Sequence, residues 1–162
     1  MIHLIKKKRV IPIQAYGKLP LTNSFIAITK TKNALEWQSW LYRQNLDLTS
    51  DMKPFLFQNS YKSSFIIGLI SKSCDGMARE FPFSIFIDWK KHWSKKKFID
   101  TDIHDIWIEL KNIQQANNST FDFYQSLFQQ EITVQPNRKE KKIINWVEIN
   151  LDQKRYPIFF LN

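Results

Sequence analysis

Cysteine, glycine and histidine are scarce in this chain of 162 residues, and each shortage argues against a class of site. Cys74 is the only cysteine, so no intramolecular disulfide can form and nothing indicates an oxidising compartment. With only 3 glycines there is little room for a glycine-rich phosphate-binding loop. The 3 histidines, His3, His92 and His104, follow no metal-ligand spacing. The sequence therefore predicts a protein that is not an enzyme and that holds no metal or cofactor.

Long apolar runs are also missing. No stretch approaches the ~18–20 apolar residues of a membrane span. The basic segment 6–9 precedes an apolar run that Pro12 and Gln14 interrupt. That run is too short for a signal peptide, which needs ~7–15 apolar residues. These absences predict a soluble, cytoplasmic protein.

Aromatic residues, by contrast, are abundant. The chain has 13 Phe, 6 Trp and 5 Tyr, and 43% of its residues are hydrophobic. Such a composition can bury enough apolar area to offset the entropy lost when the chain becomes ordered. Domains commonly run to ~100–200 residues, and no linker rich in Pro, Gly or Ser divides the chain. Residues 1–162 are therefore expected to form a single domain.

Positive charge is in excess, with 24 Lys+Arg against 15 Asp+Glu and a formal net charge of +9. Clustered cations can bind a polyanion by releasing counterions from its phosphates. Equally, they can be a solvated surface, since net charge reports on solubility and association rather than on fold. The segment 90–97, with Trp89 and Trp93, is where phosphate contacts could combine with base stacking. A basic nucleic-acid-binding module is thus one alternative function.

Short apolar runs predict several strands. The continuous runs at 65–70 and 83–89 suit strands that are buried on both faces. The predicted fold class is α/β, with a central, mostly buried β-sheet and helices packed on its faces. The remaining strands are expected at 10–16, 54–57, 145–149 and 156–161.

Helices are expected where apolar residues recur at spacings of three and four. Asn33 is a candidate N-cap for a helix whose third residue is Glu36. This helix would present Trp37, Trp40 and Leu41 on one face. Two further helices are expected, one near Asp102 with the stripe Ile103, Ile106, Trp107 and Leu110, and one near Phe121 with Tyr124, Leu127 and Phe128.

Two segments carry a more specific pattern. The first is Tyr16-Gly17-Lys18-Leu19-Pro20, followed by Phe25 and by the Trp37-Gln38-Ser39-Trp40-Leu41 helix. The second is 68–83, which contains Ser73, Asp75, Arg79, Phe81 and Pro82. Together they resemble the TagF family of type VI secretion-associated proteins. Members of that family combine a Y-G-K-L-P stretch, a W-x-x-W-L helix and a P-S-x-D-x-x-G-R-x-F-P-L block.

The resemblance covers roughly residues 13–89, and Ala78 stands where the family pattern has a glycine. It implies a cytoplasmic, non-catalytic accessory protein of a bacterial type VI secretion system. It further implies repression after translation through binding of a forkhead-associated-domain scaffold protein. The candidate partner-binding or motif residues are Tyr16, Gly17, Lys18, Leu19, Pro20, Trp37, Trp40, Ser73, Asp75, Arg79, Phe81 and Pro82.

The same residues also have purely structural interpretations. Gly17 permits a bend or a close approach that a Cβ would block. Ser73 and Asp75 are natural residues of a turn between two strands. Asp75 and Arg79 lie four residues apart and can pair if the segment is helical. These residues could thus form a structural turn or a patch that docks a partner.

The exposure of the two tryptophans and a third possible function stay open on the sequence. Trp37 and Trp40 can both be core residues, or one of them can stay partly exposed as an interface anchor. The third function is a small hydrolase that uses Cys74 or Ser73 as its nucleophile. No histidine adjacent in sequence supports Cys74 in that role, and a buried, inert cysteine is the commoner case.

Overall fold

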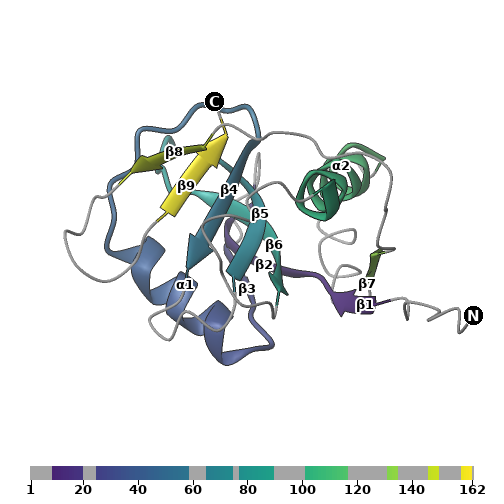
Figure 1. Ribbon diagram of the computed structural model, residues 1–162. Coiled ribbons are helices and arrows are strands. Elements are labelled where there is room, and N and C mark those ends of the chain that lie inside the picture. The colour runs from purple at the N-terminus through teal and green to yellow at the C-terminus, as the bar shows by residue number, and fades with distance from the viewer. Residues whose placement is uncertain are drawn as a thin grey trace, which may run out of the picture.

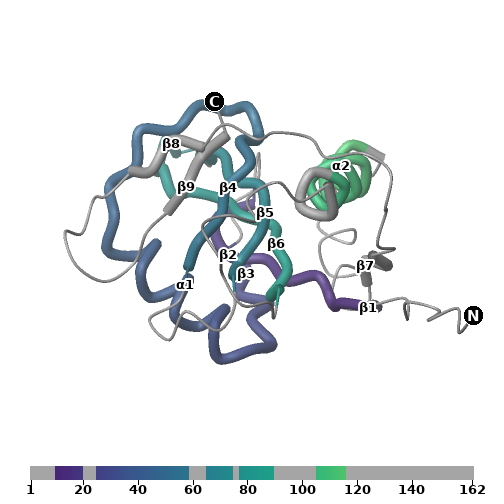
Figure 2. Tube along the Cα trace, in the orientation of Figure 1, coloured from purple at the N-terminus to yellow at the C-terminus, as the bar shows by residue number. Residues whose placement is uncertain are grey.

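In the computed structural model of the chain, the described residues are 9–19, 25–58, 65–74, 77–89, 101–116, 131–134, 146–149 and 158–161. Side chains are described for 10–19, 25–58, 65–74, 77–89 and 105–115, which Figure 2 draws in colour.

A seven-stranded sheet in the order β3-β2-β6-β5-β4-β9-β8 forms the centre of the fold (Figure 1). All of its pairings are antiparallel. β1 (Arg9–Pro12) and β7 (Glu131–Val134) form a separate two-stranded sheet. The strands of the large sheet are β2 (Gln14–Lys18), β3 (Phe25–Ile28), β4 (Lys53–Gln58), β5 (Phe65–Ser71), β6 (Phe83–Trp89), β8 (Trp146–Ile149) and β9 (Ile158–Leu161).

The two continuous apolar runs become the central strands β5 and β6, and every residue of both is buried. Because successive side chains of a strand point to opposite faces, each strand supplies two cores. In β5, Phe65, Ile67 and Leu69 belong to one hydrophobic cluster, and Ile66 and Ile70 belong to the other. An antiparallel sheet can leave one face in water, but the described part of this one has an apolar cluster on each face.

One helix contributes to each cluster. α1 (Lys32–Tyr42) buries Ala34, Trp37, Trp40 and Leu41 in what we call the α1-side cluster. α2 (Thr101–Ala116) contributes Ile106, Trp107 and Leu110 to the opposite, α2-side cluster. Figure 1 shows the two helices on either side of the central strands. The predicted α/β class is confirmed, with a core that the sheet dominates.

Two details of the strands differ from the sequence prediction, and one predicted helix is untested. The strand expected at 10–16 is two strands, because the chain leaves the small sheet after Pro12 and enters the large one at Gln14. The short strands β3 and β7 were not predicted. The helix expected near Phe121 lies outside the described residues.

The N-cap of α1 is Thr31, so the prediction of Asn33 was wrong. The Thr31 hydroxyl accepts the Ala34 N–H at 3.3 Å, as an N-cap residue does. Asn33 lies within the helix, and its side-chain amide donates to the Asp88 carboxylate at 3.0 Å. The Asn33 side chain therefore binds a residue 55 positions away instead of capping the first turn of its own helix.

Neither of the helices in the described residues is long and apolar enough to cross a membrane.

Candidate functional site

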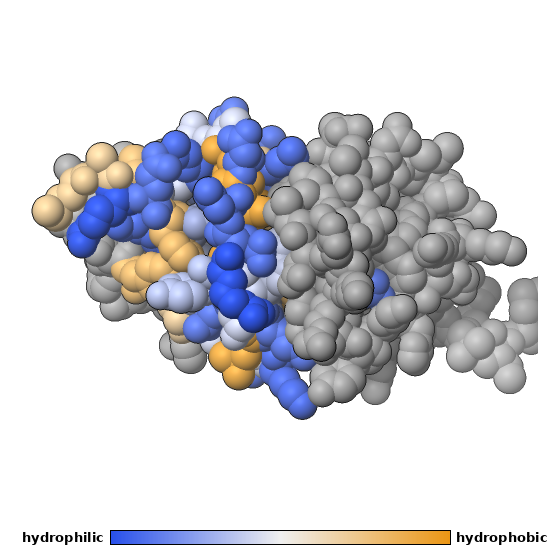
Figure 3. All heavy atoms as spheres, turned by 90° about the vertical axis from the view of Figure 1, so that its left-hand side faces the viewer, coloured by the Kyte–Doolittle hydropathy of each residue, from blue (hydrophilic) through white to orange (hydrophobic). Residues whose placement is uncertain are grey.

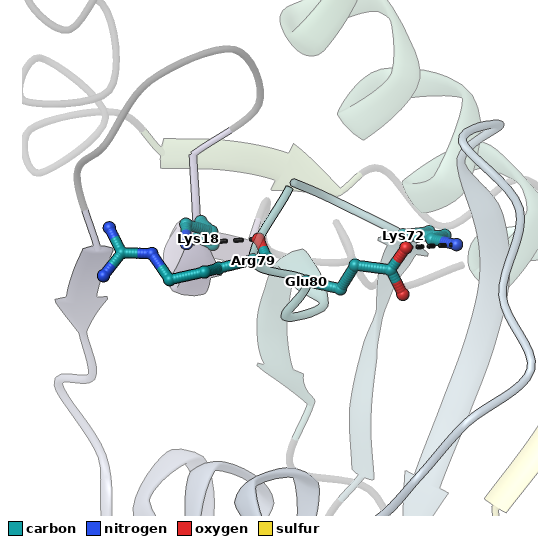
Figure 4. A network of polar contacts seen from close by, with 4 residues as sticks. All are labelled: Lys18, Lys72, Arg79 and Glu80. Carbon is teal, nitrogen blue, oxygen red and sulfur yellow. Dashed lines mark hydrogen bonds and ion pairs between the residues drawn. The ribbon is translucent and has the colours of Figure 1, made fainter. Parts of the chain in front are cut away.

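The two motif segments meet where β2 pairs with β6. Gly17 lies opposite Phe83 in the antiparallel register. The Lys18 N–H donates to the Pro82 carbonyl at 3.3 Å, and the Lys18 ammonium donates to the Arg79 carbonyl at 3.2 Å (Figure 4). We call residues 16–19 together with 72–74 and 77–82 the motif junction. The structure thus joins two segments that are far apart in sequence, since Lys18 and Arg79 are separated by 61 positions.

Gly17 is required at this junction for steric reasons. Its φ is +127°, a conformation that residues with a side chain rarely adopt. A Cβ built at this position would lie 1.9 Å from the carbonyl oxygen of Pro82. The close approach of two main chains, one of the two sequence-based interpretations of Gly17, is what the structure shows.

A buried hydrogen-bonded chain connects the tryptophan helix to the same strands. The Trp37 indole N–H donates to Ser84 Oγ at 3.1 Å, and Ser84 Oγ–H donates to the Tyr16 carbonyl at 3.1 Å. The Trp37 ring also stacks on Phe55, with ring centroids 4.3 Å apart. The helix with the tryptophans, the first motif strand and β6 therefore form one packed unit.

Both tryptophans belong to the core. The exposed fraction is 0% for Trp37 and 1% for Trp40, and their rings stack on each other at 5.6 Å. The interpretation of both as core residues is confirmed, and the alternative that one of them stays partly exposed as an interface anchor is wrong. The 3.6-residue period identified the buried face of the helix, but the depth of burial depends on the strands beneath it.

The connection from β5 to β6 is an extended hairpin in its described part. Cys74 forms an isolated antiparallel bridge with Glu80, and the Phe81 N–H donates to the Ser73 carbonyl at 3.0 Å. These contacts favour the interpretation of the segment as a turn between two strands. Asp75 and Pro20 lie outside the described residues, so the expected Asp75–Arg79 pair stays a prediction.

A different ion pair crosses this hairpin. Lys72 Nζ lies 2.6 Å from a Glu80 carboxylate oxygen, and both side chains are exposed (Figure 4). The hydrogen bond to Glu80 and the negative charge of that carboxylate raise the pKa of Lys72. The Lys72 N–H also donates to the Thr49 carbonyl at 2.7 Å, which ties the segment after α1 to the hairpin.

An aromatic cluster covers one side of the junction. The Phe81 ring lies 5.8 Å from that of Tyr16, 5.0 Å from that of Phe25 and 6.3 Å from that of Tyr42. Burial raises the pKa of the Tyr16 phenol, and electrostatic interaction with the neighbouring Tyr42 raises it further. By contrast, Phe25 is 49% exposed and Tyr42 is 72% exposed. This cluster therefore presents aromatic surface to solvent, unlike the tryptophan pair.

The exposed part of the cluster borders an open cleft of about 430 Å³. Its lining is more polar than apolar, and it includes the charged residues Lys72, Glu80 and Asp47. Figure 3 shows the side of the molecule on the left of Figure 1, where small hydrophobic patches alternate with hydrophilic side chains. The cleft is lined by Tyr42, Gln44, Asn45, Leu46, Asp47, Leu48, Lys72, Glu80, Phe81 and Pro82.

Tyr42 is the residue of this site that sequence reasoning missed. It ends α1 directly after the buried Leu41, and the pattern of the helix alone does not show that its ring reaches Phe81. The signal available in the sequence was a large aromatic residue just beyond the apolar stripe of a helix.

The hydrolase and the nucleic-acid-binding module lose part of their support. Ser73 is 4% exposed, so its hydroxyl is not accessible as the nucleophile of a hydrolase, whereas Cys74 is exposed. Trp89 is 4% exposed in the α2-side cluster, so its ring is not available to stack on a base. The basic segment 90–97 lies outside the described residues.

In the part of the chain that the structure describes, no three His, Cys, Asp or Glu side chains gather as metal ligands.

Ala78 has a left-handed backbone conformation, with φ +57° in the hairpin between β5 and β6. Glycine is the residue that adopts this conformation most easily. A left-handed conformation costs an L-residue ~1–2 kcal/mol, whereas replacement by glycine increases the entropy of the unfolded chain at a cost of ~0.5–1 kcal/mol.

We therefore expect Ala78→Gly to raise the free energy of unfolding by ~0.5–1 kcal/mol, measured by urea denaturation. The matched control is Ala27→Gly, since Ala27 is also exposed but lies in extended backbone. That change is expected to lower stability by ~0.5–1 kcal/mol. A loss of stability in both variants would show that the backbone at Ala78 is not strained.

Comparison with known proteins finds similarity among solved structures. No protein-family model matches the chain. No curated protein matches it either. Among solved structures, the chain is similar to the crystal structure of PA0076 from Pseudomonas aeruginosa PAO1, with 17% sequence identity and a TM-score of 0.47. The match covers 86% of this chain and 69% of that chain.

Proposed function

We propose that this protein is a cytoplasmic, non-catalytic accessory component of a bacterial type VI secretion system. In this proposal it represses the system after translation by binding a forkhead-associated-domain scaffold protein. A scaffold held in such a complex is removed from the pool that can enter the assembly. The proposal includes the prediction that residues 1–162 form one domain.

The observation that carries the proposal is the motif junction. The segments on which the resemblance to the TagF family rests are brought into direct contact through Lys18, Arg79 and Pro82. The W-x-x-W-L helix is attached to the same place through Trp37 and Ser84. These contacts join the motif segments into a single packed unit, and one such unit can hold exposed neighbours in place as a common docking surface.

We place the docking contacts on the exposed side of this junction. Aromatic residues and arginine are enriched in the hot spots of protein interfaces, where they fill well-packed pockets from which water is excluded. Phe25, Tyr42 and Arg79 supply such exposed side chains here, and Tyr42 also lines the cleft. The buried motif residues Tyr16, Gly17 and Trp37 hold this surface in place.

The first test is affinity purification of the tagged protein from its own cells, with nuclease treatment and a wash at moderate salt. We expect mass spectrometry to identify a forkhead-associated-domain protein or other components of a type VI secretion system. Recovery of none of these components would contradict the proposal.

Variants of exposed residues then locate the docking surface. We expect Tyr42→Ala and Arg79→Ala each to weaken binding of the recovered scaffold by about ten-fold or more, as truncation of a hot spot does. The double change Asp75→Ala with Arg79→Ala should weaken it at least as much. Because Tyr42 and Arg79 are exposed, circular dichroism and unfolding curves of their variants should remain close to those of the parent protein.

The matched control is Leu35→Ala, which truncates another exposed apolar side chain of α1. Its affinity should be unchanged. If Tyr42→Ala and Arg79→Ala also bind normally while folded, the motif junction is structural and the docking surface lies elsewhere.

The basic nucleic-acid-binding module retains the net charge of +9 as its support. It predicts that nucleic acid is retained when nuclease is omitted and that binding falls steeply with salt. Retention of nucleic acid at low salt, together with no secretion component in the treated sample, would favour it.

A further inference from the structure

β3 is a short edge strand of apolar residues. Among the strands that the structure describes it lies at the end of the sheet and pairs with β2 alone. An edge strand carries a row of N–H and C=O groups that point away from the sheet and can pair with another strand. Proteins commonly protect such edges with charged residues or proline within the strand. β3 has the sequence Phe-Ile-Ala-Ile and contains neither.

The side chains of β3 leave room for a neighbour. Phe25 is 49% exposed and Ala27 is exposed, whereas Ile28 is buried in the α2-side cluster. The Phe25 ring contacts the Tyr16 ring at 5.2 Å on the α1 side of the sheet. A strand added beside β3 would therefore cover the exposed part of Phe25 and Ala27 with its own side chains.

Basic residues lie at both ends of this edge. Lys30 and Lys32 follow β3 directly and are exposed. At the other end, Phe25 is the register partner of Lys18, whose ammonium binds the Arg79 carbonyl. The Arg79 side chain is exposed and extends away from the Glu80–Lys72 pair in Figure 4. The apolar edge is thus flanked by cations.

We propose that β3 is a site of strand addition, at which an extended segment of another protein pairs with the sheet. The charge around the edge selects a segment with alternating apolar residues and acidic residues at its ends. A second copy of this chain fits less well, because pairing of two β3 strands would bring the same cations together. The inference goes beyond the proposed scaffold interaction and does not depend on which protein supplies the strand.

The probe for this site is a synthetic peptide of alternating Val and Thr residues with two Glu at each end. Hydrogen exchange of the full-length protein is followed by NMR or mass spectrometry with and without the peptide. We expect binding to slow exchange specifically within 25–28, because new main-chain hydrogen bonds form there. A peptide flanked by Lys instead of Glu should bind at least ten-fold more weakly at low salt.

Charge reversal tests the selectivity of the edge. We expect Lys30→Glu to weaken binding of the acidic peptide by about three- to ten-fold at low salt, and by less at high salt. Lys111→Glu is the matched control, since Lys111 is exposed on α2. It should leave the affinity unchanged.

Three results would overturn the inference. The peptide could fail to bind, or it could bind without slowing exchange in β3. Alternatively, protection of β3 could rise with protein concentration when no peptide is present, which would identify a second copy as the occupant. None of these results bears on whether the purified complex contains a secretion-system scaffold, so the two proposals can fail separately.

Discussion

Gly17→Ala is expected to lower the free energy of unfolding by about 3 kcal/mol or more. Two costs add at this position. The φ of +127° is strained for any residue with a side chain, and the new Cβ would lie 1.9 Å from the Pro82 oxygen. That oxygen belongs to the main chain of the neighbouring segment, so it cannot move aside as the end of a flexible side chain can. Domains are stable by only ~5–15 kcal/mol, so urea denaturation should show a large fall in midpoint.

Gly17→Ala also tests whether Gly17 supports the fold or contacts the proposed partner protein directly. Because Gly17 is buried, its replacement should weaken partner binding only in proportion to the loss of folded protein. Ala78→Gly provides the contrast, since it relieves a left-handed conformation at the other side of the junction. A fall of less than about 1 kcal/mol for Gly17→Ala would show that β2 and the Pro82 segment can move apart cheaply.

Trp37→Ala is the second change with a large expected effect. Truncation of a buried tryptophan typically lowers the free energy of unfolding by ~3–5 kcal/mol, because it removes apolar contacts and leaves a cavity. Trp37 has no exposed surface, stacks on Phe55 and Trp40, and donates to Ser84. Thermal and urea unfolding should both show the loss.

Trp37→Phe divides this effect into packing and hydrogen bonding. It keeps an aromatic ring but removes the N–H that binds Ser84, which should cost ~1–3 kcal/mol. Tyr42→Ala is the control on the same helix, because Tyr42 is 72% exposed and its loss should change stability by less than about 1 kcal/mol. Equal losses for Trp37→Ala and Tyr42→Ala would contradict the assignment of Trp37 to the core.

Part of the fold could be predicted because the relevant signals are local. The runs at 65–70 and 83–89 are apolar almost without interruption, and strands buried on both faces have that pattern at that length. The spacing of Trp37, Trp40 and Leu41 likewise predicted the buried face of α1. The cap was misplaced at Asn33 because its amide binds Asp88, which is 55 residues away.

The motif junction could be predicted only as two separate segments. Nothing in either segment indicates that Lys18 reaches the Arg79 carbonyl or that Phe25, Tyr42 and Phe81 form one aromatic cluster. β3 was missed for the same reason, since a strand of four residues is stabilised by its pairing with β2 rather than by its own sequence.

The amino-acid sequence by itself determined the abundance of apolar residues, the central strands, the buried face of α1 and the resemblance of two segments to one family. These properties depend on composition and on periodicity within a few residues. The tertiary structure decided which motif residues are buried, which reach solvent and which strand is left at the edge of the sheet. Those outcomes depend on contacts between residues such as Trp37 and Ser84, 47 positions apart, and only folding brings such residues together.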